Sequence, residues 1–210
     1  KSNYIIIPYA SIWNIFNLSV VMLPITRWSL FSLIFGTSVE QRIGFHRFVA
    51  MVTIWCQIAH FILMAIFYGS SPIGIGYIFQ ADINKCNLAG FLAWIFFMVM
   101  GMSSHPMVRR LFFEFFFASH YVWGLAGIIS AAIHVRGTYV MVAMSISILL
   151  LLLDYALRLI LSVGGTVLEA KEDGQISHLK MQVPKRFRCS AGQYVYLWIP
   201  AVSWLQTHPF

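Results

Sequence analysis

Charged residues are scarce in this sequence. Only 10% of its 210 residues are Asp, Glu, Lys or Arg, against roughly 25% in soluble domains. The mean hydropathy is +0.78 and 60% of the residues are hydrophobic. The deficit of charge and the long apolar runs exclude an ordinary soluble domain and place the chain among polytopic membrane proteins.

Cysteine is also rare, since the chain has only Cys56, Cys86 and Cys189. Their wide separation argues against a disulfide framework and fits no zinc-binding spacing. The net charge of +7 comes from 14 basic and 7 acidic residues. In a soluble protein this excess would suggest a nucleic-acid partner, but in a membrane protein basic residues collect in cytoplasmic loops. We therefore expect a lipid bilayer, and no nucleic acid, as the partner of this chain.

Five apolar segments are long enough to cross a hydrocarbon core of about 30 Å. They lie near residues 8–34, 44–68, 88–104, 113–135 and 138–162. Pro24 and Arg27 interrupt the first segment, which predicts a kink or an early end, and Pro106 predicts a break after the third. The sequence therefore predicts an all-α transmembrane helix bundle of about five helices over residues 1–162.

Basic residues in the loops predict the orientation of the bundle. The connections at 36–47 and 104–112 carry more basic than acidic residues, which places them in the cytoplasm and the 69–87 connection outside. Everything after residue 162 is then cytoplasmic. We expect a multi-pass integral membrane protein with a cytoplasmic C-terminal domain, and we expect the chain to be part of a longer protein.

The C-terminal residues 163–210 differ in character from the apolar spans. Short segments rich in Val, Ile, Leu and Tyr lie at 166–170, 176–183 and 193–199. The turn-like KEDG separates the first two, which is typical of a hairpin. These residues predict the start of a soluble β domain.

Two of the predicted spans contain histidines at the same interval. His46 and His60 lie in the second span, and His120 and His134 lie in the fourth, so each pair is fourteen residues apart. Fourteen helical residues return to within about 40° of the starting face and rise about 21 Å. Because both spans run outward from the cytoplasm, His46 is level with His120, and His60 is level with His134. Each level offers one imidazole from each of two helices, which is the arrangement that holds a haem through two axial nitrogens.

Other roles for these histidines are less favoured. A single intramembrane histidine often only bonds a neighbouring helix, but two depth-matched pairs favour an inner haem at His46 and His120 and an outer haem at His60 and His134. A proton relay would normally add Asp or Glu at mid-depth, and these spans have none there. One zinc ion cannot bind ligands about 21 Å apart. Arg47 is a candidate contact for a haem propionate. A haem-free transporter with histidine-lined helices is the remote alternative.

Several longer motifs accompany the paired histidines. FHRF surrounds His46, RRLFFEFFFASH leads to His120, LLLLLDYALRLI lies in the last span, and AGQYVYLWIP is followed by THPF. In these features the chain resembles the ferric reductase-like transmembrane family, which includes fungal and plant metalloreductases and the NADPH oxidases. The resemblance implies that residues 163–210 are the truncated N-terminal part of a cytoplasmic FAD-binding β-barrel domain. It also implies that His208, Pro209 and Phe210 contact FAD.

The resemblance further implies an NADPH-dependent oxidoreductase of the plasma membrane. In that family NADPH, bound by a domain absent from this sequence, reduces FAD, and FAD passes single electrons through two haem b groups to an external acceptor. The fourteen-residue spacing of both pairs is closer to metalloreductases, because the second pair of the phagocyte-type oxidases is one residue shorter. The favoured acceptor is Fe(III) or Cu(II) in an external chelate. The alternative is a superoxide-generating NADPH oxidase, whose acceptor is O₂.

Overall fold

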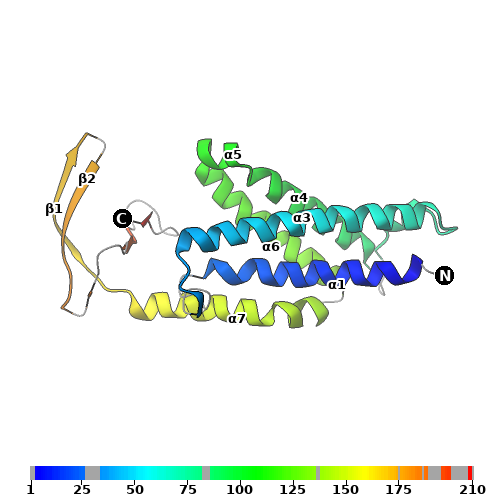
Figure 1. Ribbon diagram of the computed structural model, residues 1–210. Coiled ribbons are helices and arrows are strands. Elements are labelled where there is room, and N and C mark those ends of the chain that lie inside the picture. Colours follow the sequence, from blue (N-terminus) through cyan, green and yellow to red (C-terminus); the bar gives the residue numbers. More distant parts are fainter. Residues whose placement is uncertain are drawn as a thin grey trace. The chain divides into compact units, whose positions relative to one another are not determined.

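The computed structural model describes residues 3–26, 34–81, 86–135, 138–174, 176–185, 187–188, 195–199 and 208–209. Their backbone forms mainly helices, followed by short antiparallel strands towards the C-terminus (Figure 1). The predicted fold class, a helical membrane bundle followed by the start of a β domain, is confirmed. The chain divides into two compact units, Lys1–Leu157 and Arg158–Phe210.

Five long helices of the described part lie at the positions of the five apolar segments. They are α1 (Asn3–Met22), α3 (Val39–Gly69), α4 (Asn87–Ser103), α6 (Phe113–His134) and α7 (Thr138–Leu161). Three described segments have the length and apolar composition needed to cross a membrane, namely Val39–Gly69, Phe113–His134 and Val142–Leu161. The segments Ile12–Ile25 and Asn87–Ser103 are apolar but shorter.

Two prolines stand where the sequence predicts that helices end. Helix α1 stops at Met22 and is followed by the 3₁₀ helix η1 (Leu23–Ile25), which contains Pro24. Arg27, the other predicted interruption of the first segment, lies outside the described residues. Helix α4 stops at Ser103, and Pro106 begins the short helix α5 (Pro106–Leu111). Another 3₁₀ helix, η2 (Ile75–Phe79), lies in the connection between α3 and α4.

A capping box starts the longest helix. The Ser38 hydroxyl accepts a hydrogen bond from Gln41 N, and the Gln41 side chain accepts one from Ser38 N. The two bonds satisfy backbone groups that a helix start leaves unpaired. They define the start of α3, whose first residue, Val39, is seven residues before His46.

The helices of the first unit pack in pairs. Helix α4 packs closely on α6, and α1 packs on α3, whereas α3 and α6 have few close backbone contacts among the described residues. A Cβ atom added to Gly127 of α6 would lie 2.8 Å from the Phe97 ring of α4, and one on Gly124 would lie 3.3 Å from Met100 Sδ. Small residues let membrane helices approach each other, so these glycines set the separation of α4 and α6.

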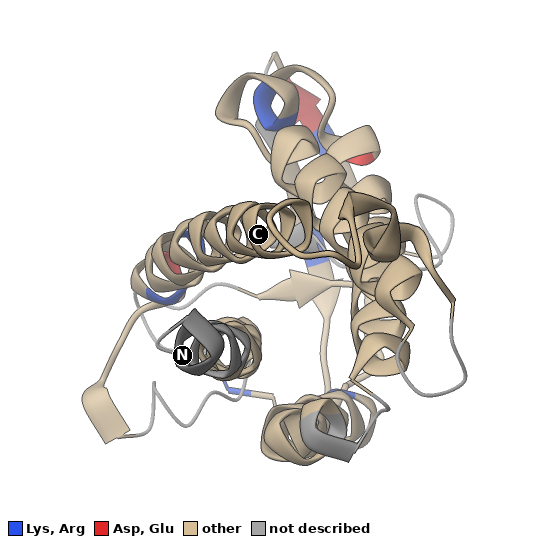
Figure 2. Cartoon of the chain, turned by 90° about the vertical axis from the view of Figure 1, so that its right-hand side faces the viewer, with Lys and Arg blue, Asp and Glu red and all other residues tan. Residues whose placement is uncertain are grey.

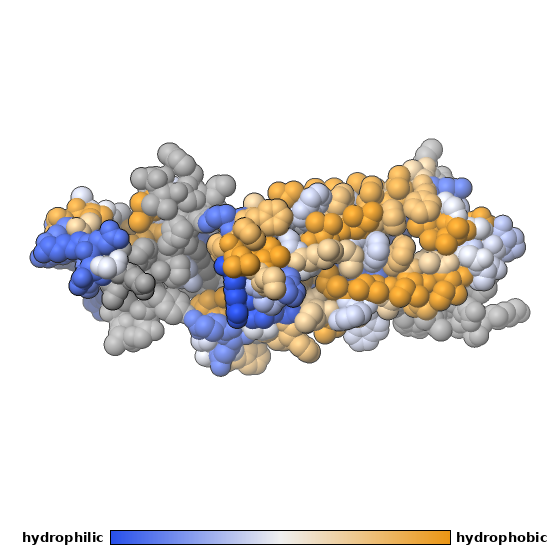
Figure 3. Space-filling model, turned by 90° about the horizontal axis from the view of Figure 1, so that it is seen from above, coloured by the Kyte–Doolittle hydropathy of each residue, from blue (hydrophilic) through white to orange (hydrophobic). Residues whose placement is uncertain are grey.

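The first unit buries little of its apolar surface. Its core comes from α1, α3, α4 and α7 and contains Leu18, Val21, Val49, Ala93, Phe97, Val140 and Met144. Most other large apolar side chains on the helices are exposed, and apolar residues cover much of the helical surface in Figure 3. Charged residues are sparse along the described helices (Figure 2). An apolar, nearly uncharged helical surface is suited to lipid.

The second unit contains two small antiparallel sheets. Strands β1 (Thr166–Asp173) and β2 (Ile176–Gln182) form a hairpin. Gly174 follows β1 with a φ of 60°, a left-handed conformation that glycine adopts without strain. Strands β3 (Tyr196–Leu197) and β4 (His208–Pro209) pair with each other. The predicted hairpin is confirmed, while only Tyr196 and Leu197 of the predicted 193–199 segment are in a described strand.

Candidate functional site

The rings of His46 and His120 meet between α3 and α6. Their centres are 6.2 Å apart and their planes are inclined by 66°. Two imidazole nitrogens that each lie about 2 Å from a shared metal ion put the ring centres roughly 6.4 Å apart. The observed distance therefore fits one metal ion between the two rings. Because α3 and α6 have few close backbone contacts, the two side chains approach each other without the helices being tightly packed.

Hydrogen bonds fix the orientation of both rings. His46 Nδ1 lies 2.8 Å from the carbonyl oxygen of Val21. His120 Nδ1 lies 3.1 Å from Ser104 Oγ, and that hydroxyl donates its own proton to the Met100 carbonyl oxygen at 2.7 Å. The Val21 carbonyl oxygen can only accept, so His46 Nδ1 carries the proton and Nε2 has a lone pair. With the Ser104 proton directed to Met100, the Ser104 oxygen accepts from His120 Nδ1, which gives His120 the same tautomer. A bond from the distal ring nitrogen to a fixed acceptor is the usual support of a metal-binding histidine.

The second pair lies farther along the same helices. His60 lies on α3 and His134 lies at the end of α6. His134 Nδ1 lies 3.0 Å from the Cys86 carbonyl oxygen, which again leaves Nε2 with a lone pair. His60 Nδ1 is buried and has no hydrogen-bond partner among the described residues. The ring of His134 packs on Gly90 of α4, where an added Cβ atom would lie 2.7 Å from Nδ1.

The two histidine pairs lie at separate depths. Helices α3 and α6 are continuous between their two histidines, so the predicted separation of about 21 Å along each helix applies. The described residues contain no group of three or more His, Cys, Asp or Glu side chains that could hold a metal ion. Each level thus offers two imidazoles, which is the number of protein ligands that a bis-histidine haem needs. The assignment of the four histidines as haem ligands stays a prediction.

Two arginines lie near His46 on α3. Arg47, the predicted propionate contact, has an exposed side chain. Arg42 is one turn before His46, and only 5% of its surface is exposed. It lines a cavity of about 220 Å³ together with Pro24, Phe35, Thr37, Gln41 and Phe45. A buried guanidinium at this level is a second cation that could contact an anionic group.

Two residues of the motif predicted to contact FAD, His208 and Pro209, pair with the strand that contains Tyr196 and Leu197. In the β3–β4 pair, His208 is opposite Leu197 and Pro209 is opposite Tyr196. Phe210, the third predicted contact, lies outside the described residues. The pairing brings both parts of the sequence motif to one small sheet, and the FAD contacts themselves stay a prediction.

Several supporting residues were not predicted from the sequence. Val21 and Cys86 act through backbone carbonyl groups, which leave no mark in a residue pattern. Ser104 and Gly90 lie on α4 or directly after it, and their relation to the histidines depends on how α4 packs on α6. A detectable signal existed only for Arg42, which stands four residues before His46 and therefore on the same face of the helix.

Two family models match the chain. The ferric reductase like transmembrane component matches residues 10–131, and an FAD-binding domain matches residues 166–210. The chain is 27% identical over 190 residues to Ferric reduction oxidase 5 of Arabidopsis thaliana, which covers 89% of the chain and 26% of that protein. It is 28% identical over 188 residues to Ferric/cupric reductase transmembrane component 2 of Schizosaccharomyces pombe, which covers 86% of the chain and 32% of that protein.

The chain spans about a quarter to a third of the length of these curated relatives. The family predicted from the histidine pairs and the C-terminal motif is confirmed, since the transmembrane family model alone covers more than half of the chain. This chain therefore belongs to the ferric reductase like transmembrane component family.

Proposed function

We propose that the chain is the membrane part of an oxidoreductase that carries electrons across a bilayer to an external metal chelate. The relatives named for ferric or cupric reduction support Fe(III) or Cu(II) as the acceptor. The FAD-binding match supports a flavin on the donor side, with NADPH as the source of electrons. The loop charges support a cytoplasmic position for this side, and the plasma membrane is the proposed location.

The geometry at His46 and His120 carries this proposal. The ring centres are 6.2 Å apart, and Nδ1 of each ring is bonded to an acceptor. Both Nε2 atoms then carry lone pairs, which supports the binding of one metal ion between the rings. We assign His46 and His120 to an inner haem b, and His60 and His134 to an outer one. If bound, haem would supply one-electron transfer, with these histidine pairs as the residues that would hold it.

Charged and polar groups of the chain complete the proposed site. Arg42 and Arg47, close to His46, are the proposed contacts for carboxylates of the inner haem, because a cation stabilises a nearby anion in a medium of low dielectric constant. His208, Pro209 and Phe210 are the proposed contacts for FAD.

Sealed vesicles of the full-length protein test this function. The cytoplasmic side faces outward, NADPH is added outside, and an Fe(III) chelate is trapped inside with an Fe(II)-specific dye. We expect anaerobic formation of Fe(II) inside the vesicles. Superoxide production in air without anaerobic Fe(III) reduction would instead indicate the oxidase. Absence of any electron transfer across the sealed membrane would contradict both forms of the proposal.

The Ser104 hydroxyl is expected to stabilise the inner haem through His120. Ser104→Ala removes the acceptor for His120 Nδ1, and loss of such a partner typically weakens a metal site by about 10- to 100-fold. We expect the inner haem to dissociate at least about tenfold faster, measured by transfer to an excess of a haem-binding protein. Ser103→Ala is the matched control, because within the described part of the chain Ser103 Oγ bonds only the Met100 carbonyl oxygen. Equal haem loss from both variants would contradict the role of Ser104.

A further inference from the structure

Four buried polar atoms on α1, α3 and α4 have no hydrogen-bond partner among the described residues. They are Asn14 Oδ1, Gln57 Oε1, His60 Nδ1 and Trp94 Nε1. Within a bilayer, an unpaired polar group is strongly unfavourable, because lipid tails offer it no hydrogen bond. Several such atoms around one histidine therefore point to a small polar partner outside the polypeptide.

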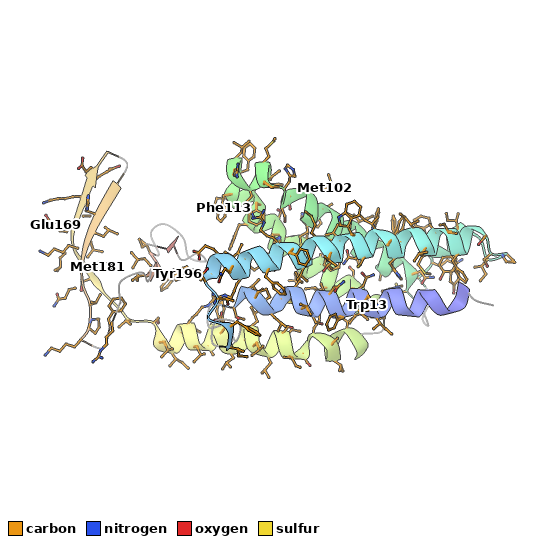
Figure 4. All side chains as sticks on the ribbon, in the orientation of Figure 1. Trp13, Met102, Phe113, Glu169, Met181 and Tyr196 are labelled. Atoms are coloured by element: carbon orange, nitrogen blue, oxygen red, sulfur yellow. The ribbon has the colours of Figure 1, made fainter. Side chains whose placement is uncertain are left out.

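The pairing of α1 with α3 brings Asn14 to the level of His60. The two helices run antiparallel side by side (Figure 1), and Asn17 Nδ2 bonds Cys56 Sγ at 3.5 Å. Asn14 is one turn before Asn17, and His60 is one turn after Cys56. Because the helices are antiparallel, both steps lead in the same direction across the membrane. Figure 4 labels Trp13, the neighbour of Asn14, near the middle of α1.

Gln57 and Trp94 belong to the same level. Gln57 precedes His60 by three residues, so the two side chains are neighbours on one face of α3. The Trp94 ring stacks on Phe61, the residue after His60, with ring centres 4.2 Å apart and planes inclined by 12°. The polar atoms thus come from three helices, α1, α3 and α4.

The donors and acceptors in this group complement a water molecule. If His60 Nε2 binds a metal ion, Nδ1 carries the proton and donates, whereas the Asn14 and Gln57 oxygens accept. A water molecule accepts one hydrogen bond from His60 Nδ1 and donates two, one to each amide oxygen. Its second lone pair remains for Trp94 Nε1. Buried waters typically make about three hydrogen bonds to groups that are otherwise unsatisfied.

We propose that a bound water molecule joins His60 Nδ1 to the side-chain oxygens of Asn14 and Gln57. The inference rests on the proposed function, because it assigns His60 Nε2 to the outer haem. The proposed water distinguishes His60 from the other three histidines. The Nδ1 atoms of His46, His120 and His134 bond directly to protein acceptors. Asn14 and Gln57 are then positioning residues, which act on the outer haem through the water and through His60.

The expected consequence is a change in the outer haem potential. An acceptor on Nδ1 makes the imidazole a stronger ligand and tunes the metal, and a more basic ligand favours the oxidised iron. Gln57→Leu or Asn14→Leu should remove part of this support and make the outer haem easier to reduce. We expect roughly a tenfold change in its reduction equilibrium constant, which is about 59 mV for a one-electron couple.

Potentiometric titration of the full-length protein measures this change, with the inner haem as an internal reference. Asn17→Leu and Thr53→Val are the matched controls, because each also removes a polar side-chain group from α1 or α3. Their groups have protein partners, Cys56 Sγ and the Val49 carbonyl oxygen. We expect both controls to leave the outer potential unchanged.

The outcomes separate this inference from the proposed function. An unmodified protein without an outer low-spin haem would refute the function itself. Two normal haems, with the outer potential of Gln57→Leu and Asn14→Leu equal to that of the controls, would refute only the water. If the variants lose haem altogether, a high-resolution map of the unmodified protein decides. Water density about 3 Å from His60 Nδ1 supports the inference, and a direct bond from Nδ1 to a side chain contradicts it.

Discussion

His46→Ala is expected to remove the inner haem and abolish electron transfer across the membrane. His46 supplies one of the two imidazoles at its level, and the described residues offer no third His, Cys, Asp or Glu side chain there. Loss of a hydrogen-bond partner of a metal ligand typically lowers metal affinity or activity by about 10- to 100-fold. Loss of the ligand itself should therefore reduce electron flux across the membrane by at least about a hundredfold. The measurements are the haem content per chain and Fe(II) formation in sealed vesicles.

His60→Ala provides the informative comparison. This variant should lose the outer haem and also fail to reduce the external chelate. If the inner haem accepts electrons from the flavin, as we propose, NADPH should still reduce the haem that remains in His60→Ala but not the one that remains in His46→Ala. His105→Ala is the control, because His105 is exposed and caps α5 by accepting a hydrogen bond from Met107 N. Normal flux in His46→Ala would show that the inner assignment is wrong.

Gly90→Val is expected to remove the outer haem while leaving the inner haem in place. A Cβ atom at this position would lie 2.7, 2.8 and 2.9 Å from Nδ1, Cε1 and Cγ of His134. The ring is held by its hydrogen bond to the Cys86 carbonyl oxygen, so it cannot move away without losing that bond. Overpacking of this kind costs about 1–3 kcal/mol, and the displaced ring no longer presents Nε2 to the metal.

Haem content and the spectrum of each haem measure the effect of Gly90→Val. We expect close to one haem per chain, with the spectrum of the inner site, and a smaller effect of the same direction for Gly90→Ala. Gly69→Ala is a control with open space around the added Cβ atom. Cys86→Ser is a second control, because the site uses only its backbone oxygen. Two intact haems in Gly90→Val would contradict the packing of Gly90 against a haem ligand.

The sequence was most informative where regular helix geometry applies. The equal intervals from His46 to His60 and from His120 to His134 define two levels because α3 and α6 are unbroken helices. Pro24 and Pro106 lie where α1 and α4 have ended, since proline cannot continue a helix hydrogen-bond pattern. The β1–β2 hairpin was predicted from the strand-forming residues around KEDG, but Lys171, Glu172 and Asp173 extend β1, and of these four residues only Gly174, with its positive φ, lies outside the strand.

Features that depend on contacts between helices could not be predicted. The acceptors for His46 and His134 are carbonyl groups of Val21 and Cys86. Every residue has such a carbonyl group, so only the packing of the helices determines which ones bond the histidines. In the sequence, Gly90 is one small residue among others in an apolar segment. Its contact with the His134 ring is apparent only from the packing of α4 on α6. The unpaired oxygens of Asn14 and Gln57 likewise acquire meaning only once α1 is placed beside α3.

Arginine burial also lay beyond the sequence pattern. Arg42 and Arg47 are both basic residues close to His46, and a count of loop charges does not distinguish them. The structure buries Arg42 and exposes Arg47, because the face of α3 at position 42 meets the cavity beside Pro24 and Phe35. Helix periodicity gives the face of a residue, but the neighbour that covers this face depends on the fold.

The haem content and spin state of the purified full-length protein test the central claim most directly. Absorption and electron paramagnetic resonance spectra should show about two low-spin haems per chain, each with two nitrogen axial ligands. The count should fall to about one in His60→Ala and in His134→Ala, with the same haem lost in both. A folded protein that reduces external Fe(III) without haem, or with a single haem that survives replacement of all four histidines, would contradict the account.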